Sequence, residues 1–480
     1  IPGVPAIANY QGGDFKGVID ALEEGYFEAM GINLLWLSPV LENPEGAYIA
    51  ADRVHQFSGF HGYWPTHPRQ IEFRWGDRDG VAAERLKELI DKAHARGIRV
   101  MFDIVLNHVH EDHTYQEDFP AWFMADPCPC TTDPGACNWD TNPLFCWFID
   151  YLPDLDFRNH DVTMQVSRDV EWLVTEFDVD AFRIDAAKHM HHIIMRRTAK
   201  RLTDRFEQGG GAPFYLVGET FTGADGHGLI MNYVAPWELD GQYDFPLLYP
   251  IRDSFAFDVS FRNLSERIRV GQQAYGEAYT WMSPFLGNHD IPRMATMIAT
   301  GGQGFDPWNG DPDPMATPGP VSQWEIINRM SMGFAFVITQ PGIPLIYYGD
   351  EIGLAGWADP DNRRMMSFEP GLSDNQRTLL ARIQALGSAR RDHEALRRGR
   401  FQELWVDDDL FIYARDNGRG DVAIVAMNKG ADRIQQVPIP AELGLEGVSM
   451  TDTLAGERTV VVGGGQVTFT LDNWEYAIFI

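Results

Sequence analysis

The sequence predicts an α/β protein: a (β/α)8 TIM barrel with a subdomain inserted after its third strand and a C-terminal antiparallel β-sandwich domain. Short apolar runs alternate with helical patterns over most of the chain, and this order implies right-handed βαβ units around a parallel sheet. Roughly eight such units fit a closed barrel better than a doubly wound sheet. No glycine-rich dinucleotide or phosphate fingerprint occurs in the sequence, which also disfavours a doubly wound sheet.

The predicted strands are short apolar runs, and the predicted helices between them carry apolar residues on one face. Strands of the barrel are expected at 32–40, 98–108, 179–185, 212–219, 241–248, 283–290 and 342–351. The clearest helical patterns are 80–97, which Gly97 closes, 161–177 and 189–207.

The start of the barrel presents a discrepancy. Residues 12–31 form a helical pattern ahead of the first clear strand, so another strand should precede them. Only 4–10 is available there, and Pro5 makes it a poor central strand because proline cannot donate to a ladder. Either these residues serve as the strand, or the given sequence starts after it.

Two segments break the alternation and define the expected domains. Residues 109–153 are too long for an ordinary βα loop and indicate an inserted subdomain. Beyond about 394, short strands punctuated by Gly and Asn predict an antiparallel β domain. We therefore expect the barrel at 1–108 and 154–393, a subdomain B at 109–153, and an all-β domain at 394–480.

Charge and hydropathy exclude several classes of partner. The chain has 39 Lys and Arg against 69 Asp and Glu, a formal net charge of −30. Nucleic acids and anionic membranes need basic patches, so we expect neither as a partner, and no apolar run is long enough to span a membrane. The charge favours a neutral or cationic ligand. The 14 Trp and the aromatic content of 12% suit either sugar stacking or a large core.

The cysteines lie together in one loop-like region rich in Pro, Asp and Asn: Cys128, Cys130, Cys137 and Cys146. Two local disulfides are the favoured interpretation, which predicts a secreted, extracellular protein, with the periplasm as the alternative. A zinc site is the other interpretation, although the C-P-C spacing lacks the paired CxxC of structural zinc sites. The sequence leaves the pairing open.

Polar side chains gather where the predicted strands end, which in a barrel is the face that carries the working residues. These strand ends supply Asp103, His108, Arg183, Asp185, Glu219, His289 and Asp290. Ordinary explanations exist for single members. Asp185 could cap the helix that follows, and Glu219 could be a solvated loop residue. Asp290 could pair with Arg293. Three carboxylates on three strands, with an arginine beside one and a histidine beside another, indicate an active site.

Several motifs carry a resemblance to a known family. The main ones are "DIVLNH" (103–108), "FRIDAAKH" (182–189), "VGET" (217–220) and "FLGNHD" (285–290), with "LPDLD" (152–156), "HGYW" (61–64) and "DPDNRR" (359–364) beside them. With these motifs in this order, the chain resembles the α-amylase family of glycoside hydrolases, which are retaining enzymes on a (β/α)8 barrel. The resemblance covers nearly the whole chain, including the insert and the C-terminal domain.

The resemblance implies a catalytic triad. Retaining glycosidases need a carboxylate nucleophile and a proton donor about 5–5.5 Å apart. By motif position Asp185 is the nucleophile, Glu219 the general acid and base, and Asp290 the stabiliser of the oxocarbenium-like transition state. Arg183, on the same strand face as Asp185, would keep that carboxylate ionised. We expect Glu219 to be less solvated than Asp185 and further from Arg183, since its pKa must be higher.

The resemblance also implies a set of substrate-binding residues: His61, Tyr63, Trp64, His108, Arg183, Lys188, His189, His289, Asp359 and Arg363. In the family, the two histidines at the strand ends and the Tyr63 ring hold the sugar before the cut, and Asp359 with Arg363 closes that subsite. Lys188 and His189 lie on the leaving-group side and accompany α-1,4 cleavage. Plain core packing of Tyr63 and Trp64, and a solvated first helical turn at Lys188 and His189, are the alternatives.

A structural Ca²⁺ is implied as well. Calcium takes oxygen ligands in flexible geometry. By motif position these are Asn107, Asp154 and the carbonyl of His189, with a further carbonyl from the insert near Leu144. Such an ion would lock the insert against the barrel. His110 and His113 lie close by in sequence and could form a transition-metal site, but we expect them to be surface residues.

The motifs together predict a monomeric, calcium-stabilised hydrolase that cuts internal α-1,4-glucosidic bonds of starch and maltooligosaccharides with retention. "LPDLD" and the Lys-His pair favour an amylase over the 1,6-cleaving and glucosidase branches. "WADPDNRRMM" (357–366) resembles relatives that act on short maltodextrins, so a maltodextrin-acting glucosidase or a transglycosylase stays open. A non-catalytic carbohydrate-binding relative is disfavoured, because such proteins typically lack one or more of the three carboxylates.

Overall fold

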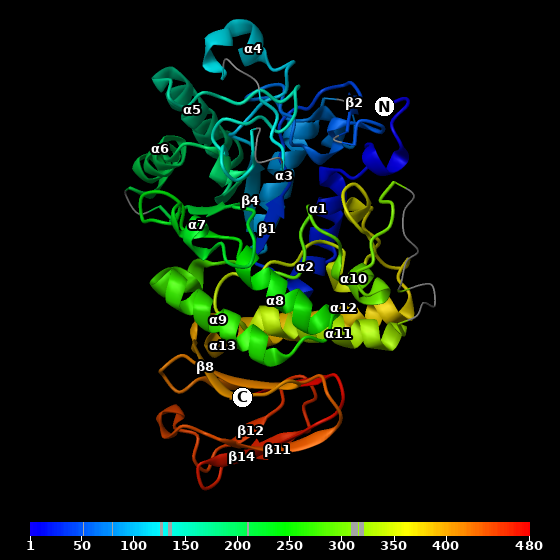
Figure 1. Cartoon of the computed structure of the whole chain (residues 1–480), viewed down its shortest axis with the longest axis vertical. Helices are drawn as coiled ribbons and strands as arrows, with labels where there is room; N and C mark the ends of the chain where they lie inside the picture. Colours follow the sequence, from blue (N-terminus) through cyan, green and yellow to red (C-terminus); the bar gives the residue numbers. More distant parts are fainter. Residues whose placement is uncertain are drawn as a thin grey trace. The chain divides into compact units, whose positions relative to one another are not determined.

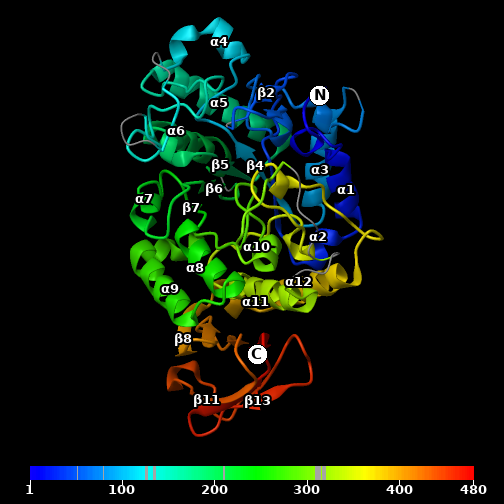
Figure 2. The same cartoon turned by 45° about the vertical axis from the view of Figure 1, so that its right-hand side comes forward.

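The computed structural model describes residues 1–50, 52–78, 80–124, 128–132, 137–208, 211–308, 315 and 321–480. Contacts within the chain divide it into two compact units, which Figures 1 and 2 show in two views. The first unit comprises Ile1–Glu28, Ile32–Phe221 and Gly228–Tyr243. The second comprises Ala29–Gly31, Thr222–His227 and Asp244–Ile480. The three-part domain division stays a prediction.

The first unit is built on a parallel sheet with the order β1-β4-β5-β6-β7 among the described residues. The strands are β1 (Leu34–Leu37), β4 (Arg99–Ile104), β5 (Ala181–Ile184), β6 (Tyr215–Gly218) and β7 (Gly241–Gln242). Each falls inside a predicted strand but is shorter, because the polar residues at its C-terminal end leave the ladder. The core of the unit includes Phe102 and Phe182, which pair across β4 and β5.

Helices precede and follow these strands along the chain. They are α1 (Phe15–Glu23), α2 (Tyr26–Ala29), α3 (Ala82–His94), α4 (Thr114–Asp118), α5 (His160–Phe177), α6 (His192–Leu202) and α7 (His227–Met231). Figure 1 shows α5 beside α6, and contacts also join α1 to α3. α5 begins where Asn159 accepts the Asp161 N–H, and it ends at Asp178 in a left-handed conformation with φ 56°. The helical patterns predicted around α1, α3, α5 and α6 are confirmed.

Residues 4–10 do not form a strand, so the interpretation that they serve as the first barrel strand is wrong. Ala6–Ala8 form a 3₁₀ turn that follows Pro5. Ser58 instead donates both its backbone N–H and its hydroxyl to the Ala8 carbonyl. β2 (Tyr48–Ile49) and β3 (Gln56–Phe57) form a small antiparallel pair in the same part of the chain.

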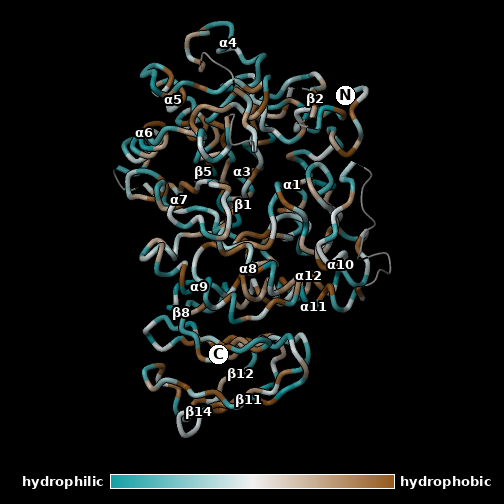
Figure 3. The backbone as a smooth tube through the Cα atoms, in the orientation of Figure 1, coloured by the Kyte–Doolittle hydropathy of each residue, from teal (hydrophilic) through white to brown (hydrophobic). Residues whose placement is uncertain are grey.

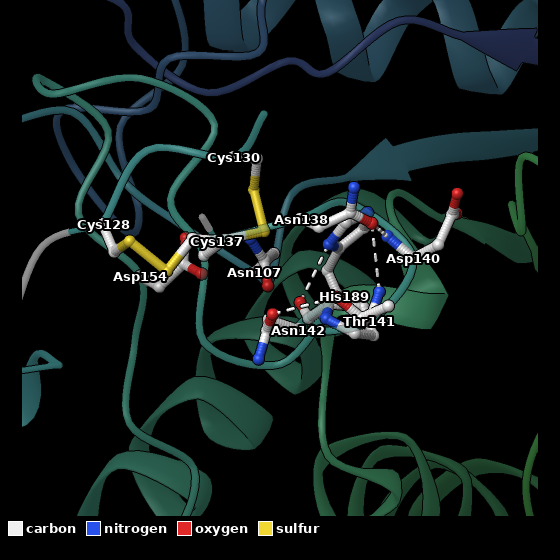
Figure 4. Close-up of a disulfide and its surroundings, with 12 residues drawn as sticks. Asn107, Cys128, Cys130, Cys137, Asn138, Asp140, Thr141, Asn142, Asp154 and His189 are labelled. Carbon is white, nitrogen blue, oxygen red and sulfur yellow. Dashed lines mark hydrogen bonds between the residues drawn. A yellow bond between two sulfur atoms is a disulfide. The ribbon is translucent and has the colours of Figure 1, made fainter. Parts of the chain in front are cut away.

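Two disulfides join the four cysteines. Cys128 pairs with Cys137 and Cys130 with Cys146, across sequence separations of 9 and 16 residues. Figure 4 shows the Cys128–Cys137 bond near Asn107 and Asp154. The prediction of two local disulfides is confirmed. The zinc interpretation is wrong, because all four thiols are consumed by these bonds.

The second unit contains α8 (Phe245–Ala256), α9 (Phe261–Tyr275), α10 (Met294–Thr300), α11 (Gln323–Thr339), α12 (Asp374–Asp392) and α13 (Glu394–Arg398). In Figure 3 the hydrophobic colour follows α11, whose residues from 330 to 339 are all buried. The runs predicted as strands at 283–290 and 342–351 pair in parallel through one bridge, Phe285 with Leu345. The run at 241–248 is shorter than predicted, because Asp244 caps α8.

The C-terminal part of the second unit is antiparallel β structure, as predicted. Its strands are β8 (Arg400–Val406), β9 (Leu410–Asp416), β10 (Val422–Asn428), β11 (Arg433–Pro438), β12 (Ser449–Thr451), β13 (Thr459–Val461), β14 (Gln466–Leu471) and β15 (Glu475–Phe479). Among the described residues one sheet has the order β15-β10-β9-β8, and two further pairs are β11-β14 and β12-β13. β14 alternates exposed polar residues with buried Val467, Phe469 and Leu471, the pattern of a strand with one face in a core.

In the part of the chain that the structure describes, no helix combines the length and the apolar character needed to cross a membrane.

Candidate active site

The two carboxylates predicted to act as nucleophile and acid lie at the ends of neighbouring strands. Ile184 on β5 pairs with Gly218 on β6, and Asp185 and Glu219 are the next residues of each chain segment. The Glu219 N–H donates to the Ile184 carbonyl at 2.9 Å, and the Asp185 N–H donates to the Ile104 carbonyl at 3.1 Å. Because paired strands run about 4.8 Å apart, this register brings the two carboxylates to the same edge of the sheet.

Arg183 connects these carboxylates. Its Nη1 donates to Asp185 Oδ1 at 2.5 Å, and its Nη2 lies 3.9 Å from Glu219 Oε2. The arginine side chain is 1% exposed. Arg183 is therefore a buried, hydrogen-bonded neighbour of Asp185, and a rigid guanidinium fork fixes the position of a carboxylate that it contacts.

The expected difference between the two carboxylates is borne out in distance, since Glu219 is further from Arg183 than Asp185 is. It is not borne out in solvation, because Asp185 is 8% exposed and Glu219 is 7% exposed. Proximity to the guanidinium is therefore the feature that distinguishes their electrostatic environments.

Asp103 completes the support of Arg183 from β4. Arg183 Nη1 also donates to both carboxylate oxygens of Asp103, at 2.9 and 3.1 Å. The Tyr63 hydroxyl and the Trp36 indole donate to Asp103 Oδ2 at 2.7 and 3.2 Å. Burial raises the pKa of Asp103 to about 7, although Arg183 opposes this shift. Asp103 is thus a hub that fixes the arginine, a tyrosine and a tryptophan together.

Glu219 is held by the backbone that follows Asp185. Its Oε2 accepts the Ala186 N–H at 3.1 Å, and its carbonyl accepts the Ala187 N–H at 2.8 Å. Ala186 has φ 51°, a left-handed conformation that is strained for a residue with a Cβ. Among the residues that the structure describes, no side chain caps the helical turn or the helix that follows Asp185, so the capping alternative for this carboxylate is wrong.

The aromatic residues of "HGYW" lie beside this hub. The Tyr63 ring is stacked near His61 at a centroid distance of 5.8 Å, and Arg183 lies over its face at 5.8 Å. Trp64 is buried against His61 at 4.5 Å. Nε2 of His108 donates to the Tyr63 carbonyl at 3.1 Å. Trp64 is thus packed inside the protein, and Tyr63 also contacts the groups that hold Asp185. The predicted substrate-binding roles of both residues stay predictions.

Lys188 and His189 are buried, which excludes the solvated-turn alternative. They lie in a 3₁₀ turn, Ala187–His189, ahead of α6. Lys188 Nζ is 3.6 Å from Asp140 Oδ1, and Nδ1 of His189 donates to the Pro143 carbonyl at 2.9 Å. Burial lowers the pKa of His189 to about 4, so the ring is neutral near pH 7. Both residues thus contact the disulfide-bonded insert.

The predicted calcium ligands include a buried acid, Asp154, of which one carboxylate oxygen has no hydrogen-bond partner among the described residues. Asn107 Nδ2 donates to Asp154 Oδ1 at 3.0 Å, which leaves the amide oxygen of Asn107 for another group. Asp154 Oδ2 is buried and has no hydrogen-bond partner among the described residues. Burial raises the pKa of Asp154 well above its ordinary value. A cation would satisfy this oxygen, so the residues fit a calcium ion.

His110 and His113 are buried, so the prediction that they lie at the surface is wrong. His110 packs against Tyr48 at 4.3 Å, and His113 Nδ1 accepts the Tyr115 N–H at 3.0 Å as the cap of α4. Burial lowers the pKa of His110 to about 4 and that of His113 to about 3. Both rings therefore serve as neutral packing groups.

The second unit holds the remaining predicted site residues. Arg363 Nη2 donates to Asp290 Oδ1 at 3.3 Å, and its Nε lies 3.0 Å from Asp359 Oδ1. His289 Nε2 is 3.2 Å from Asp290 Oδ2, and its carbonyl accepts hydrogen bonds from Arg363 Nε and Asn362 Nδ2. These four residues therefore form one connected group within the second unit, and their roles in catalysis and substrate binding stay predictions.

The alternative partner of Asp290 is engaged elsewhere. Arg293 Nη1 donates to Asp350 Oδ1 at 2.8 Å and to the Tyr348 carbonyl at 2.7 Å. Its Nε donates to the Asn362 carbonyl at 2.9 Å. The expectation that Asp290 could pair with Arg293 is therefore wrong.

Sequence reasoning assigned no role to three of the groups that hold the site. Asp103 was noticed as a strand end, but its partners depend on the pairing of β4 with β5, which places it beside Arg183. Trp36 lies in the apolar run "LLWL", where nothing marks its indole as a donor to a carboxylate. The Ala186 N–H is a backbone group, and no side-chain pattern could have indicated it.

Comparison with known proteins agrees with the motifs. The sequence profile described as "Alpha amylase, catalytic domain" matches residues 6–400. The chain is 28% identical over 479 residues to a beta/alpha-amylase of Paenibacillus polymyxa, covering 98% of the chain but only 35% of that relative's length. It is 27% identical over 511 residues to a cyclomaltodextrin glucanotransferase of Klebsiella oxytoca, covering 97% of the chain and 71% of the relative. A cyclomaltodextrinase of Geobacillus thermopakistaniensis is 27% identical over 474 residues, with 95% and 68% covered.

Solved structures show the same relationship. The α-amylase of Geobacillus thermoleovorans complexed with acarbose matches with a TM-score of 0.80 and 25% identity, over 99% of this chain and 94% of that one. An Anoxybacillus α-amylase matches with a TM-score of 0.80 and 27% identity, over 99% and 91%. Fold and site thus define a glycoside hydrolase on a (β/α)8 barrel with a C-terminal antiparallel β domain. The chain belongs to the α-amylase family.

Proposed function

We propose that the protein is a retaining hydrolase that cuts α-1,4-glucosidic bonds of starch and maltooligosaccharides. The observation that carries the proposal is the Arg183 cluster, in which one buried guanidinium contacts both Asp185 and Glu219 at the ends of paired strands. Two carboxylates in unequal electrostatic environments are the requirement for retaining chemistry. The acarbose complex of the Geobacillus relative supports an α-glucan as the substrate class.

The first step forms a glycosyl-enzyme ester. An Asp185 carboxylate oxygen attacks the anomeric carbon while the bond to the leaving oxygen breaks. Arg183 holds the Asp185 carboxylate through its hydrogen bond, and Glu219 gives its proton to the leaving oxygen. Asp290 takes the role that its motif assigns, binding the sugar hydroxyls in the transition state.

The second step hydrolyses the ester. Glu219, now ionised, takes a proton from water as the water oxygen attacks the anomeric carbon, and the carbon–oxygen bond to Asp185 breaks. The Ala186 N–H bond to Glu219 holds that carboxylate in place through both steps. The product keeps the original anomeric configuration because two inversions have occurred.

Replacement of Asp185 by Asn tests this mechanism directly. We expect starch hydrolysis to fall by about 10³-fold or more, because an amide cannot act as the nucleophile. Asp178→Asn is the matched control, since its carboxylate is 93% exposed and Asn suits its left-handed conformation. Retained activity in Asp185→Asn, or equal loss in Asp178→Asn, would rule the mechanism out.

We also propose that a Ca²⁺ ion binds Asn107, Asp154 and the carbonyl of His189. The unpartnered Asp154 oxygen supports this assignment. Pro143, next to the Leu144 carbonyl considered as a further ligand, already accepts a bond from the His189 ring. When bound, the ion would supply positive charge between the insert and the barrel, a structural role.

Glycosyl transfer is the second candidate activity. The Klebsiella relative is a cyclomaltodextrin glucanotransferase and the Geobacillus relative a cyclomaltodextrinase. Transfer and hydrolysis share both steps and differ only in whether a sugar hydroxyl or water attacks the ester. Separation of the products formed from maltoheptaose over time distinguishes them, since products longer than the substrate arise only by transfer. The two disulfides support secretion of the protein, with the periplasm as the alternative.

A further inference from the structure

The Cys130–Cys146 disulfide lies against a histidine of the candidate site. One sulfur of each cysteine and one ring nitrogen of His189 all lie within 4.8 Å of one another. Figure 4 shows Cys130 and His189 in the same close-up. Cys146 is 0% exposed and His189 is 6% exposed, whereas Cys130 is half-buried. The insert therefore brings three atoms of the kinds that bind transition metals to one place, and the sulfur–sulfur bond occupies two of them.

The histidine of this cluster is held in the way that a metal ligand is held. Its Nδ1 donates to the Pro143 carbonyl at 2.9 Å, which fixes the ring and leaves the lone pair on Nε2. Histidines that bind metals almost always donate their other ring N–H to a carbonyl or a carboxylate. Pro143 belongs to the loop that the Cys130–Cys146 disulfide closes. One segment thus supplies both sulfurs and the outer partner of the imidazole.

The cluster differs in chemistry from the proposed calcium site beside it. Asn107, Asp154 and the carbonyl of His189 would offer oxygen atoms, which Ca²⁺ prefers. Thiolate sulfur and imidazole nitrogen instead favour Zn²⁺ and the softer cations. The two sets share no ligand atom, since His189 would use its carbonyl in one and its ring in the other. A cation of each class can therefore bind in its own place.

We propose that reduction of the Cys130–Cys146 disulfide creates a Cys₂His site for a thiophilic divalent cation of the Zn²⁺ class, with the His189 ring as the third ligand. A thiolate of a dithiol reductant attacks the accessible sulfur of Cys130 and releases the Cys146 thiolate. The second thiol of the reductant then displaces Cys130, and the reductant leaves as its own disulfide. The cation binds both sulfurs as thiolates, so their two protons pass to solvent.

The rearrangement that this site requires is small. Ligand atoms around a tetrahedral Zn²⁺ lie about 3.6–3.8 Å apart, and water fills a fourth position that the protein leaves open. The two sulfurs and the His189 nitrogen already lie within 4.8 Å of one another. The cation would tie up the His189 ring and so remove its contact with the departing sugar. That consequence rests on the proposed function, whereas the metal site itself does not.

The test uses the full chain with only this pair of cysteines, the double variant Cys128→Ala with Cys137→Ala. It is reduced with dithiothreitol, desalted without oxygen and titrated with Cd²⁺ in excess Ca²⁺, with the thiolate-to-cadmium charge-transfer absorbance as the readout. We expect one Cd²⁺ per chain after reduction and none before it. Adding His189→Gln should weaken binding by more than about ten-fold, which loss of an outer partner alone already reaches. His160→Gln, at an exposed histidine, should leave binding unchanged.

A second double variant, Cys130→Ala with Cys146→Ala, shows whether any two thiols of the insert suffice. After reduction it should bind Cd²⁺ at least about ten-fold more weakly, because its remaining thiols lack the histidine. Cd²⁺ should also raise the melting temperature of the reduced Cys128→Ala, Cys137→Ala protein but not of its oxidised form.

Absence of Cd²⁺ binding in the reduced Cys128→Ala, Cys137→Ala protein, whether or not near-ultraviolet circular dichroism shows it folded, would overturn the site. Equal affinity after His189→Gln, or in the second double variant, would overturn it as well. Activity on maltoheptaose that persists at full Cd²⁺ occupancy would contradict the effect on the His189 ring. Activity retained in Asp185→Asn would instead overturn the proposed function and leave the metal site standing.

Discussion

Each unit contains a buried arginine that binds a carboxylate, Arg183 in the first and Arg293 in the second, and the two ion pairs differ in how much of the carboxylate is exposed. Arg183 contacts Asp103 and Asp185, and the Asp185 side chain remains 12% exposed. Arg293 contacts Asp350, whose side chain is 1% exposed, and lies over the Tyr347 ring at 4.2 Å. The chemistry of the two ion pairs is the same. The two pairs differ in exposure: Asp185 keeps part of its carboxylate open to a ligand and Asp350 does not, so only the first pair suits the proposed reaction.

The largest expected effect distinguishes the two ion pairs: a substitution in the first should reduce activity, and a substitution in the second should reduce folding stability. Asp185→Asn should abolish turnover by the 10³-fold or more given above, while the melting temperature changes little, because Arg183 keeps Asp103 as a partner. Asp350→Asn should instead lower the free energy of unfolding by roughly 3–5 kcal/mol, since Arg293 would be left buried without a counter-charge. Its kcat per folded molecule should stay within about three-fold of the parent value.

Denaturant unfolding and turnover number, measured on the same samples, check this contrast. A stable Asp350→Asn protein with low turnover would mean that the second pair also serves the reaction. A strongly destabilised Asp185→Asn protein would mean that the first pair is structural.

The next effect concerns the hub of the Arg183 cluster. Asp103→Asn leaves Arg183 with only Asp185 and the more distant Glu219, so the guanidinium moves toward the nucleophile and misaligns it. We expect kcat/KM to fall by about 10²-fold on both maltoheptaose and α-maltosyl fluoride. Tyr63→Phe removes one hydrogen bond to Asp103 but leaves the arginine contacts, and it should cost about ten-fold or less. A smaller effect for Asp103→Asn than for Tyr63→Phe would contradict the positioning role of Asp103.

Acid stability tests the buried histidines of the insert. The pKa of His113 is about 3 in the folded protein against an ordinary value of 6.5, so unfolding takes up a proton between these values. The stabilising contribution is therefore present above pH 6.5 and is lost as the pH falls toward 3. His113→Asn keeps an acceptor for the Tyr115 N–H and removes the titration. Between pH 7 and pH 4 the free energy of unfolding should decrease in both proteins. We expect the decrease to be about 1–3 kcal/mol smaller in His113→Asn than in the parent.

Urea unfolding at several pH values gives this difference. His160→Gln, at an exposed histidine, is the control and should follow the parent. Parallel curves for the parent and His113→Asn would show that His113 does not titrate on unfolding.

Removal of calcium is expected to have the smallest effect. The proposed ion at Asn107 and Asp154 would stabilise the folded state by mass action, so excess chelator should lower the melting temperature by about 3–8 °C. Asp154→Asn should melt lower than the parent and respond no further to chelator. An unchanged melting temperature of the parent protein in chelator would count against the site.

The sequence by itself determined the order of elements and was sufficient to predict the candidate catalytic residues. Strand-end motifs predicted Asp185 and Glu219 as a pair, and the structure places them at the ends of paired strands. The β-then-α alternation predicted the parallel sheet, because side-chain periodicity reflects which face of each element is buried. The clustered cysteines predicted two disulfides, since four thiols in one short segment can meet without long-range folding.

Tertiary structure decided everything that depends on which segments meet. The disulfide pairing, the burial of His110 and His113, and the choice of Asp350 as the partner of Arg293 all join residues whose proximity no local pattern encodes. The unequal distances of Asp185 and Glu219 from Arg183 arise in the same way, because the pairing of β5 with β6 sets them. The sequence gives the chemical type of each side chain directly, whereas burial and distance depend on how the chain folds.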